Sequence, residues 1–129
     1  MNYIVYRIYY DNQIVYVGRT KQRLIDRVRM HFFGNPYMPK IDIFRTTKID
    51  YALFDSESDQ FVYEVYLINL YRPFLNQHDL GHGNLTISLP EPKFYNWESP
   101  ILEKWKEKYI EYVIDTAPLD YFNEDFYFY

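Results

Sequence analysis

Residues 3–18 read Tyr-Ile-Val-Tyr-Arg-Ile-Tyr-Tyr-Asp-Asn-Gln-Ile-Val-Tyr-Val-Gly, and this stretch decides the fold. Residues 3–10 are β-branched or aromatic with one exception, and a polar turn separates them from a second such run at 14–17. Two apolar runs joined by a short polar turn predict a β-hairpin.

The turn length sets which side chains share a face of the hairpin. With a loop over residues 11–13, Tyr6 faces Gly18, and Tyr6 and Tyr16 lie on the same face as diagonal neighbours. Gly18 then leaves room for a ligand to approach the sheet. A two-residue loop is the alternative, and it would place the two tyrosines on opposite faces.

A helix is predicted next, over residues 21–32, with Thr20 as its cap. Arg23, Arg27 and His31 recur at intervals of four and form one stripe on it. The stripe has two interpretations, a functional basic surface or an ordinary solvated edge.

Glu64 is the only ionisable residue between Phe61 and Ile68. Ser56 is a start signal for a helix through this run, and Pro73 requires the helix to end by about Tyr71. Such a helix is apolar nearly all round, which predicts burial. A carboxylate in that setting is typically paired, bound to a metal or part of a site.

The remaining pattern predicts a third strand at 50–54, a short helix at 40–45 and a loop over 74–98 with one short strand at 85–87. Ser99 and Pro100 open a last helix. The fold class expected is therefore α+β, with a small antiparallel sheet of about three strands flanked by helices.

We expect residues 1–76 to form the core domain and 77–129 to form a C-terminal extension packed on it. Residues 121–129 contain six aromatic side chains and two acids. Exposed aromatic clusters are unfavourable in water, so we expect this tail to pack on the domain's own helices, or across a homodimer or protein-partner interface.

Composition limits the class of protein. The chain has 129 residues, no cysteine, no signal-peptide pattern and no apolar stretch of the roughly 20 residues that a bilayer requires, which favours a cytoplasmic protein without a membrane partner. The net charge is −4, yet residues 1–48 carry nine Lys/Arg against three Asp/Glu. This basic third can form a local phosphate-binding surface, although a solvated basic helix explains the same charge.

An ordered set of motifs over residues 3–76 resembles the GIY-YIG nuclease domain. The first tripeptide is Ile4-Val5-Tyr6, which lacks the family's Gly, and the second is Tyr16-Val17-Gly18. The helix with Arg27 and His31 follows, then Glu64-Val65-Tyr66-Leu67-Ile68 and a closing Pro73-Phe74-Leu75-Asn76.

The resemblance implies a DNA endonuclease that hydrolyses phosphodiester bonds with a divalent metal, Mg²⁺ or Mn²⁺, held by Glu64. The implied catalytic residues are Tyr6, Tyr16, Arg27, His31 and Glu64. A tyrosine whose pKa is lowered by Arg27 and a metal would be the base, Tyr6 rather than Tyr16, which would orient water or phosphate. Arg27 would bind phosphate, and His31 would hydrogen-bond to a tyrosine or relay the proton. The residues expected to contact DNA are Arg19, Lys21, Arg23, Arg29, Lys48 and Asn76. The alternative is a non-catalytic or inhibitory DNA- or protein-binding module on the same fold, including an anti-defence factor.

Overall fold

A computed structural model describes residues 2–116, and the chain forms two compact units, 1–98 and 99–129. The elements of the first unit are, in chain order, β1 (Tyr3–Tyr10), β2 (Gln13–Thr20), α1 (Leu24–Phe33), β3 (Thr46–Phe54), α2 (Glu57–Tyr71), the 3₁₀ helix η1 (Phe74–Asp79) and β4 (Tyr95–Asn96). The described element of the second unit is α3 (Ile101–Thr116), which begins after Ser99 and Pro100 as predicted. No helix in the described range is long and apolar enough to cross a bilayer. The predicted interface of the tail at 121–129 lies outside the described residues.

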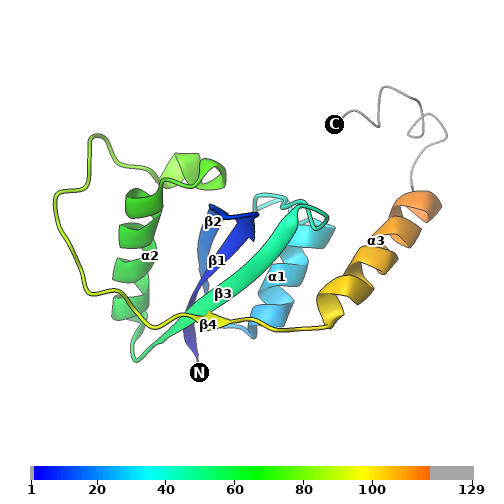
Figure 1. Ribbon diagram of the computed structural model, residues 1–129, viewed down its shortest axis with the longest axis horizontal. Helices are drawn as coiled ribbons and strands as arrows, with labels where there is room; N and C mark the ends of the chain where they lie inside the picture. Colours follow the sequence, from blue (N-terminus) through cyan, green and yellow to red (C-terminus); the bar gives the residue numbers. More distant parts are fainter. Residues whose placement is uncertain (1, 117–129) are drawn as a thin grey trace. The chain divides into compact units, whose positions relative to one another are not determined.

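The sheet has four antiparallel strands in the order β2-β1-β3-β4 (Figure 1). The predicted α+β class is therefore confirmed. The fourth strand is the two-residue β4, which pairs with Asp50 and Tyr51 of β3. A strand this short leaves no periodic pattern in a sequence, which explains why it was not predicted.

Two smaller predictions are wrong. Residues 85–87 form no strand, and Leu85 packs against the hydrophobic cluster that includes Leu67 of α2. Residues 40–45 form no helix. The backbone N–H groups of Arg45 and Thr46 both donate to the Asp42 carbonyl, which closes a turn that leads directly into β3. The grouping of 77–129 into a separate extension stays a prediction.

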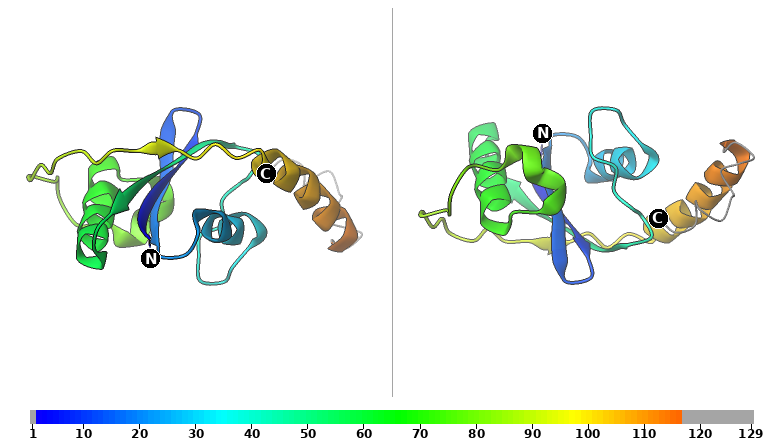
Figure 2. Two further views of the ribbon diagram at one scale, coloured as in Figure 1. Left: turned by 90° about the horizontal axis from the view of Figure 1, so that it is seen from below. Right: turned by 90° about the horizontal axis from the view of Figure 1, so that it is seen from above.

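Helices cover both faces of the sheet, α1 on one and α2 on the other (Figures 1 and 2). Val5 and Val17 lie on the α2 face and pack in one core cluster with Tyr66, Leu67 and Ile68. Side chains alternate along a strand, so the neighbouring Tyr6 and Tyr16 point to the other face, where they contact α1. The alternation thus separates a mainly apolar cluster on the α2 face from the two tyrosines on the α1 face.

The hairpin has the predicted register, but a shorter turn and a β-bulge produce it. The turn has two residues, Asp11 and Asn12, and Tyr10 pairs with Gln13 rather than with Ile14. The pairing then passes from Tyr9↔Ile14 to Ile8↔Tyr16, so Val15 has no partner on β1. This β-bulge adds back the residue that the shorter turn removes, and Tyr6 faces Gly18.

Helix α2 begins and ends where the sequence predicts. The Ser56 side chain accepts a hydrogen bond from the Asp59 N–H at its start, and Arg72 adopts a left-handed conformation (φ 49°) just before Pro73. The predicted burial on all sides is wrong. Phe61 and Val62 are each 50% exposed, because the sheet covers only one side of the helix.

Candidate active site

Three aromatic rings form the centre of the candidate site. Tyr6 from β1 is fully buried, and its hydroxyl lies 2.7 Å from Nε2 of His31 on α1. The Tyr16 ring centroid lies 6.0 Å from that of Tyr6 and 4.6 Å from that of His31. The prediction that both tyrosines share one sheet face is therefore confirmed, and His31 lies against both.

The hydrogen bonds of His31 show which of its two ring nitrogens carries a hydrogen. Nδ1 lies 3.0 Å from the Pro39 carbonyl oxygen, which can only accept, so Nδ1 carries a hydrogen. Burial lowers the pKa of His31 to about 4, with Arg27 acting in the same direction, so the imidazole is neutral at pH 7. Nε2 is then an acceptor, and the Tyr6 hydroxyl donates to it.

Gly18 makes the contact between the tyrosines possible. A Cβ atom at this position would lie 2.6 Å from the Tyr6 hydroxyl oxygen and 2.8 Å from a ring carbon of Tyr16. The sequence suggested that Gly18 leaves space for a ligand. In the structure the two tyrosine rings fill that space, so Gly18 permits their packing rather than ligand entry.

Ile4, which stands where the family has its Gly, causes no comparable difficulty. It is 5% exposed and pairs with Thr20 on one side and Leu53 on the other. An ordinary core side chain fits there, so the departure from the family tripeptide leaves the strand regular.

Glu64 belongs to α2, yet its charge acts on the tyrosines. Its carboxylate lies 3.4 Å from Nε of Arg19 on β2, and its side chain is 19% exposed. Burial raises the pKa of Glu64, while Arg19 and Arg27 lower it. The Glu64 carboxylate raises the pKa of Tyr16 on the edge strand β2, although burial is the larger cause.

Both tyrosines hold their protons more tightly than free phenols. Burial is the largest cause, and it raises the pKa of Tyr16 to about 12 and that of Tyr6 well above its ordinary value. Arg27 lowers both, in the direction that the sequence suggested, but burial and Glu64 outweigh it. In the protein alone neither tyrosine pKa is lowered, and the lowering expected beside both Arg27 and a bound metal stays a prediction.

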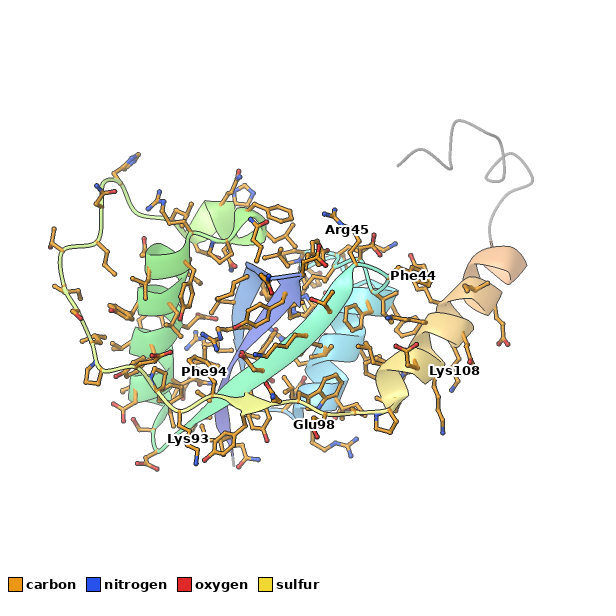
Figure 3. The ribbon with its side chains drawn as sticks, in the orientation of Figure 1. Phe44, Arg45, Lys93, Phe94, Glu98 and Lys108 are labelled. Atoms are coloured by element: carbon orange, nitrogen blue, oxygen red, sulfur yellow. The ribbon has the colours of Figure 1, made fainter. Side chains whose placement is uncertain are left out.

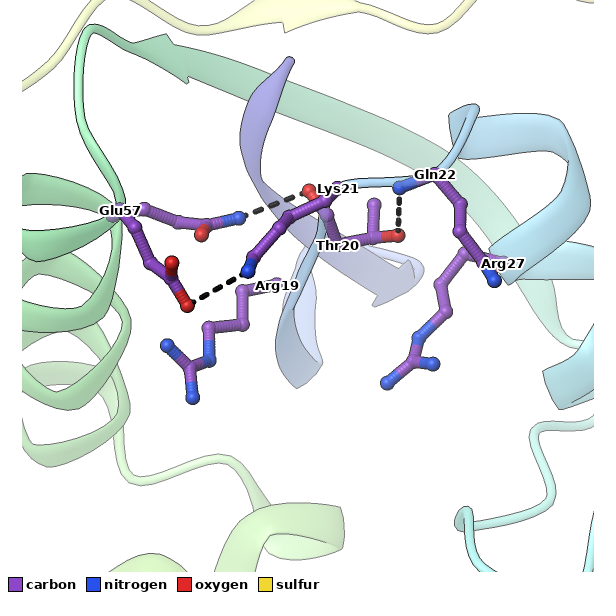
Figure 4. Close-up of a pocket in the computed structure, with 7 residues that line it drawn as sticks. Arg19, Thr20, Lys21, Gln22, Arg27 and Glu57 are labelled. Atoms are coloured by element: carbon purple, nitrogen blue, oxygen red, sulfur yellow. Dashed lines mark hydrogen bonds and ion pairs between the residues drawn. The ribbon is translucent and has the colours of Figure 1, made fainter. Parts of the chain in front are cut away.

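Arg27 connects this group to a neighbouring pocket of about 360 Å³. Its Nε atom is buried and has no hydrogen-bond partner. Arg19 and Lys21 line the same pocket, and Figure 4 shows the guanidinium groups of Arg19 and Arg27 pointing to the same side. Three cationic side chains thus line this pocket, and one of them, Arg27, also acts on both tyrosines.

The other residues expected to contact DNA lie elsewhere. Arg23 does not extend the Arg27 stripe, because its side chain is 80% exposed and paired with Asp26. Arg29 lines a different pocket, on the Met30 side of α1. Lys48 is on β3, where its Nζ lies 3.7 Å from Asp50. The structure does not bring these three into the Arg27 pocket.

Asn76, expected at the DNA surface, is 2% exposed. Its Oδ1 accepts from the Val17 N–H at 2.8 Å, and its Nδ2 donates to the Val17 carbonyl at 2.9 Å. The amide thereby holds η1 against the edge strand β2. Its contact with DNA stays a prediction. Both polar atoms of the Asn76 side chain are hydrogen-bonded within the fold.

Gln60 lines the Arg27 pocket and was not predicted from the sequence. It stands four residues before Glu64, so the two share one side of α2, and this spacing is the signal that would have found it. Its side chain is almost fully buried, as is the pair of Arg7 and Asp50 on the other half of the sheet.

The donor set suits a hard divalent cation. Among the side chains that the structure describes, no three His, Cys, Asp or Glu residues converge on one point, so Glu64 would be the main protein ligand. Mg²⁺ prefers oxygen ligands, keeps several waters and is often held by one or two carboxylates together with phosphate. A single, partly exposed carboxylate paired with Arg19, which lines the basic pocket, is a donor of the kind that this ion takes.

The chain is similar to UvrABC system protein C of Microcystis aeruginosa (strain NIES-843 / IAM M-2473), with 26% identity over 119 residues. The match covers 86% of this chain but 19% of that protein, so the chain spans about a fifth of its length. No model of a known protein family matches the chain. No solved structure matches it either.

Proposed function

We propose that this chain is a divalent-metal-dependent DNA endonuclease of GIY-YIG type that hydrolyses phosphodiester bonds. The observation that carries the proposal is the contact of Tyr6 and Tyr16 with His31, which brings together side chains from β1, β2 and α1. The charges of Arg27 and Glu64 act on both tyrosines. The distant similarity to UvrABC system protein C supports the coarser statement that this is a nuclease domain.

Phosphodiester hydrolysis requires a base, a phosphate clamp and stabilisation of the leaving oxygen. In this proposal Glu64 would hold Mg²⁺ or Mn²⁺, which when bound supplies Lewis-acid stabilisation of the phosphate and the leaving oxygen. Arg27 would bind phosphate oxygens through its guanidinium group, whose buried Nε has no hydrogen-bond partner in the protein.

The proton from the attacking water would leave through Tyr6. Its hydroxyl already donates to His31 Nε2 at 2.7 Å, so Tyr6 would pass this proton to His31 as it accepts the one from water, without forming a free tyrosinate. His31 would then be an imidazolium that still donates from Nδ1 to the Pro39 carbonyl. Tyr16, in contact with both rings, would orient water or phosphate.

One observation favours the alternative of a non-catalytic DNA- or protein-binding module. Glu64 already has a cationic partner, Arg19, at 3.4 Å. An ion pair of this kind satisfies a carboxylate without a metal. The two functions are separated by whether a metal ion replaces Arg19 at Glu64 and supports cleavage.

The experiment is cleavage of supercoiled plasmid with Mg²⁺ or Mn²⁺, with and without EDTA. We expect metal-dependent cleavage that Glu64→Gln reduces by a few orders of magnitude, because an amide is a poor ligand for Mg²⁺. Glu98→Gln, which removes the same charge at an exposed position beyond β4 (Figure 3), is the control and should cleave normally. Wild-type cleavage by a correctly folded Glu64→Gln protein would refute the metal role, and an inactive wild type would favour the binding module.

A further inference from the structure

Gln60 carries a buried acceptor that the fold does not use. The residue is 1% exposed, and its Nε2 donates to the backbone carbonyls of Ile4 and Thr20, both at 2.9 Å. Carbonyls only accept, so the amide cannot be turned the other way round. Its Oε1 is therefore fixed in place, and it has no hydrogen-bond partner.

The surroundings of Gln60 are those of a binding site. It lines the 360 Å³ pocket together with Arg19, Lys21 and Arg27. Glu57 lies at the same pocket, with its carboxylate 2.9 Å from Lys21 Nζ (Figure 4). Buried polar groups without partners are rare in proteins, and two of them, Gln60 Oε1 and Arg27 Nε, belong to residues of this one pocket.

We infer that this pocket binds one nucleotide of the DNA strand, next to the phosphate that is cut. The inference rests on the proposed function. Lys21 and Arg19 bind that nucleotide's phosphate, and Gln60 Oε1 accepts a hydrogen bond from its base. The volume is at the lower end of the range for small-molecule sites, which suits a single nucleotide.

The combination of charges and acceptors distinguishes a nucleotide from a simple anion. A phosphodiester has no hydrogen to donate at neutral pH, so phosphate alone leaves Gln60 Oε1 unpaired. The amino and imino N–H groups of bases are donors. Glu57 adds a second acceptor at the pocket, which favours bases with an amino group over thymine.

Arg27 fixes where this nucleotide lies relative to the reaction. Its guanidinium lowers the pKa of both Tyr6 and Tyr16, and the same side chain lines the pocket. A strand that places one phosphate at the tyrosines would therefore place the adjoining nucleotide at Gln60. Gln60 then becomes a residue that influences which base stands beside the cut.

The test is nuclear magnetic resonance of the full ¹⁵N-labelled chain in EDTA. The probes are the four deoxynucleoside 5′-monophosphates, abasic 2-deoxyribose 5-phosphate and inorganic phosphate. We expect the nucleotides to shift the Gln60 side-chain NH₂ signals and the Lys21 backbone signal. The abasic sugar phosphate and inorganic phosphate should shift Lys21 alone, and thymidylate should bind more weakly than the nucleotides that carry an amino group.

Variants locate the binding. Lys21→Gln should weaken nucleotide binding about twofold to fivefold, as expected for loss of one partly exposed charge contact. Lys93→Gln, an exposed lysine beside β4 at the opposite edge of the sheet (Figure 3), should leave it unchanged. Because substitution of Gln60 itself removes two structural hydrogen bonds, the Gln60 signals of the wild type are the decisive measurement.

Two results would overturn the inference. Equal shifts and affinities for nucleotides and inorganic phosphate would show a site for anions only. Unperturbed Gln60 signals would show that no base donates a hydrogen bond to Gln60 Oε1. These outcomes are independent of the nuclease test. Plasmid cleavage without a Gln60 response refutes the nucleotide pocket alone, whereas a Gln60 response without metal-dependent cleavage refutes the nuclease alone.

Discussion

Tyr6 donates its hydroxyl hydrogen to His31 Nε2 across 2.7 Å, and both side chains are fully buried. The direction follows from the Pro39 carbonyl, which requires the other imidazole nitrogen to carry a hydrogen. The buried phenol therefore has a neutral acceptor in place.

The first prediction concerns His31 and pH. Its pKa is about 4 in the folded protein against an ordinary 6.5, so the folded state favours the neutral form. That preference stabilises the protein fully above pH 6.5 and is lost as the pH falls towards 4, by up to about 3 kcal/mol. Urea unfolding of wild type and His31→Gln at several pH values should show a difference in unfolding free energy that changes over this interval.

The comparison of the two proteins isolates His31, because Glu64 has a raised pKa and acts with the opposite sign in both. A difference in unfolding free energy that stays constant between pH 7 and 4 would show that His31 titrates normally and is not a neutral acceptor for Tyr6.

The second prediction concerns Gly18. Gly18→Ala places a methyl group 2.6 Å from the Tyr6 hydroxyl, and the fully buried ring has little room to move. We expect destabilisation of about 1–3 kcal/mol, as for other overpacked cores, together with loss of cleavage. Gly81→Ala is the matched control, since its Cβ would meet only a side-chain oxygen of Asn69 at 3.3 Å. Equal stability of the two variants in chemical denaturation would contradict the packing described for the tyrosines.

The third prediction separates structural from chemical carboxylates. Asp50 forms a two-bond pair with Arg7, both bonds 2.7 Å, on the α2 face of the sheet. Asp50→Asn leaves the Arg7 guanidinium buried without a counter-charge and should cost about 3–5 kcal/mol. Glu103→Gln breaks an exposed pair with Lys106 and should cost under about 1 kcal/mol.

At a temperature where Asp50→Asn remains folded, its cleavage rate per folded molecule should equal that of the wild type. A specific loss of cleavage with normal stability would instead place Asp50 in the reaction.

The fourth prediction concerns Arg27. Arg27→Lys keeps the charge but loses the forked guanidinium that binds two phosphate oxygens at once. We expect cleavage to fall by about tenfold to a hundredfold, with no change in stability beyond about 1 kcal/mol. Arg45→Lys, at the turn before β3 (Figure 3), is the control and should cleave normally. Plasmid assays on both proteins decide the matter, and equal rates would remove Arg27 from the phosphate site.

The sequence predicted the elements that carry a strong local signal. The hairpin, the caps of α2 and the positions of Tyr6, Tyr16 and Glu64 all follow from residue periodicity and from turn and cap residues. The β-bulge at Val15 did not, because no residue type marks it. Gln60 was missed because its role depends on carbonyls of β1 and β2 that are distant in the sequence.

The exposed side of α2 shows a different limit. Periodicity reports that Phe61 and Val62 are apolar, but the number of layers packed around a helix is a property of the whole fold. The sequence also does not show which basic residues lie together. Arg19 and Arg27 line one pocket and Lys48 does not, and this depends on the path of the folded chain.

The bulge at Val15 also constrains the number of residues between Tyr6 and Tyr16 in this hairpin. The turn and the bulge together determine whether Tyr16 points to the same side as Tyr6, so neither length is free to vary alone. Loss of the bulged residue would be tolerated only with a compensating residue gained in the turn. Related chains can therefore differ by one residue in the spacing of these tyrosines and keep the same pair of rings in contact, provided that the bulge appears or disappears with the extra residue.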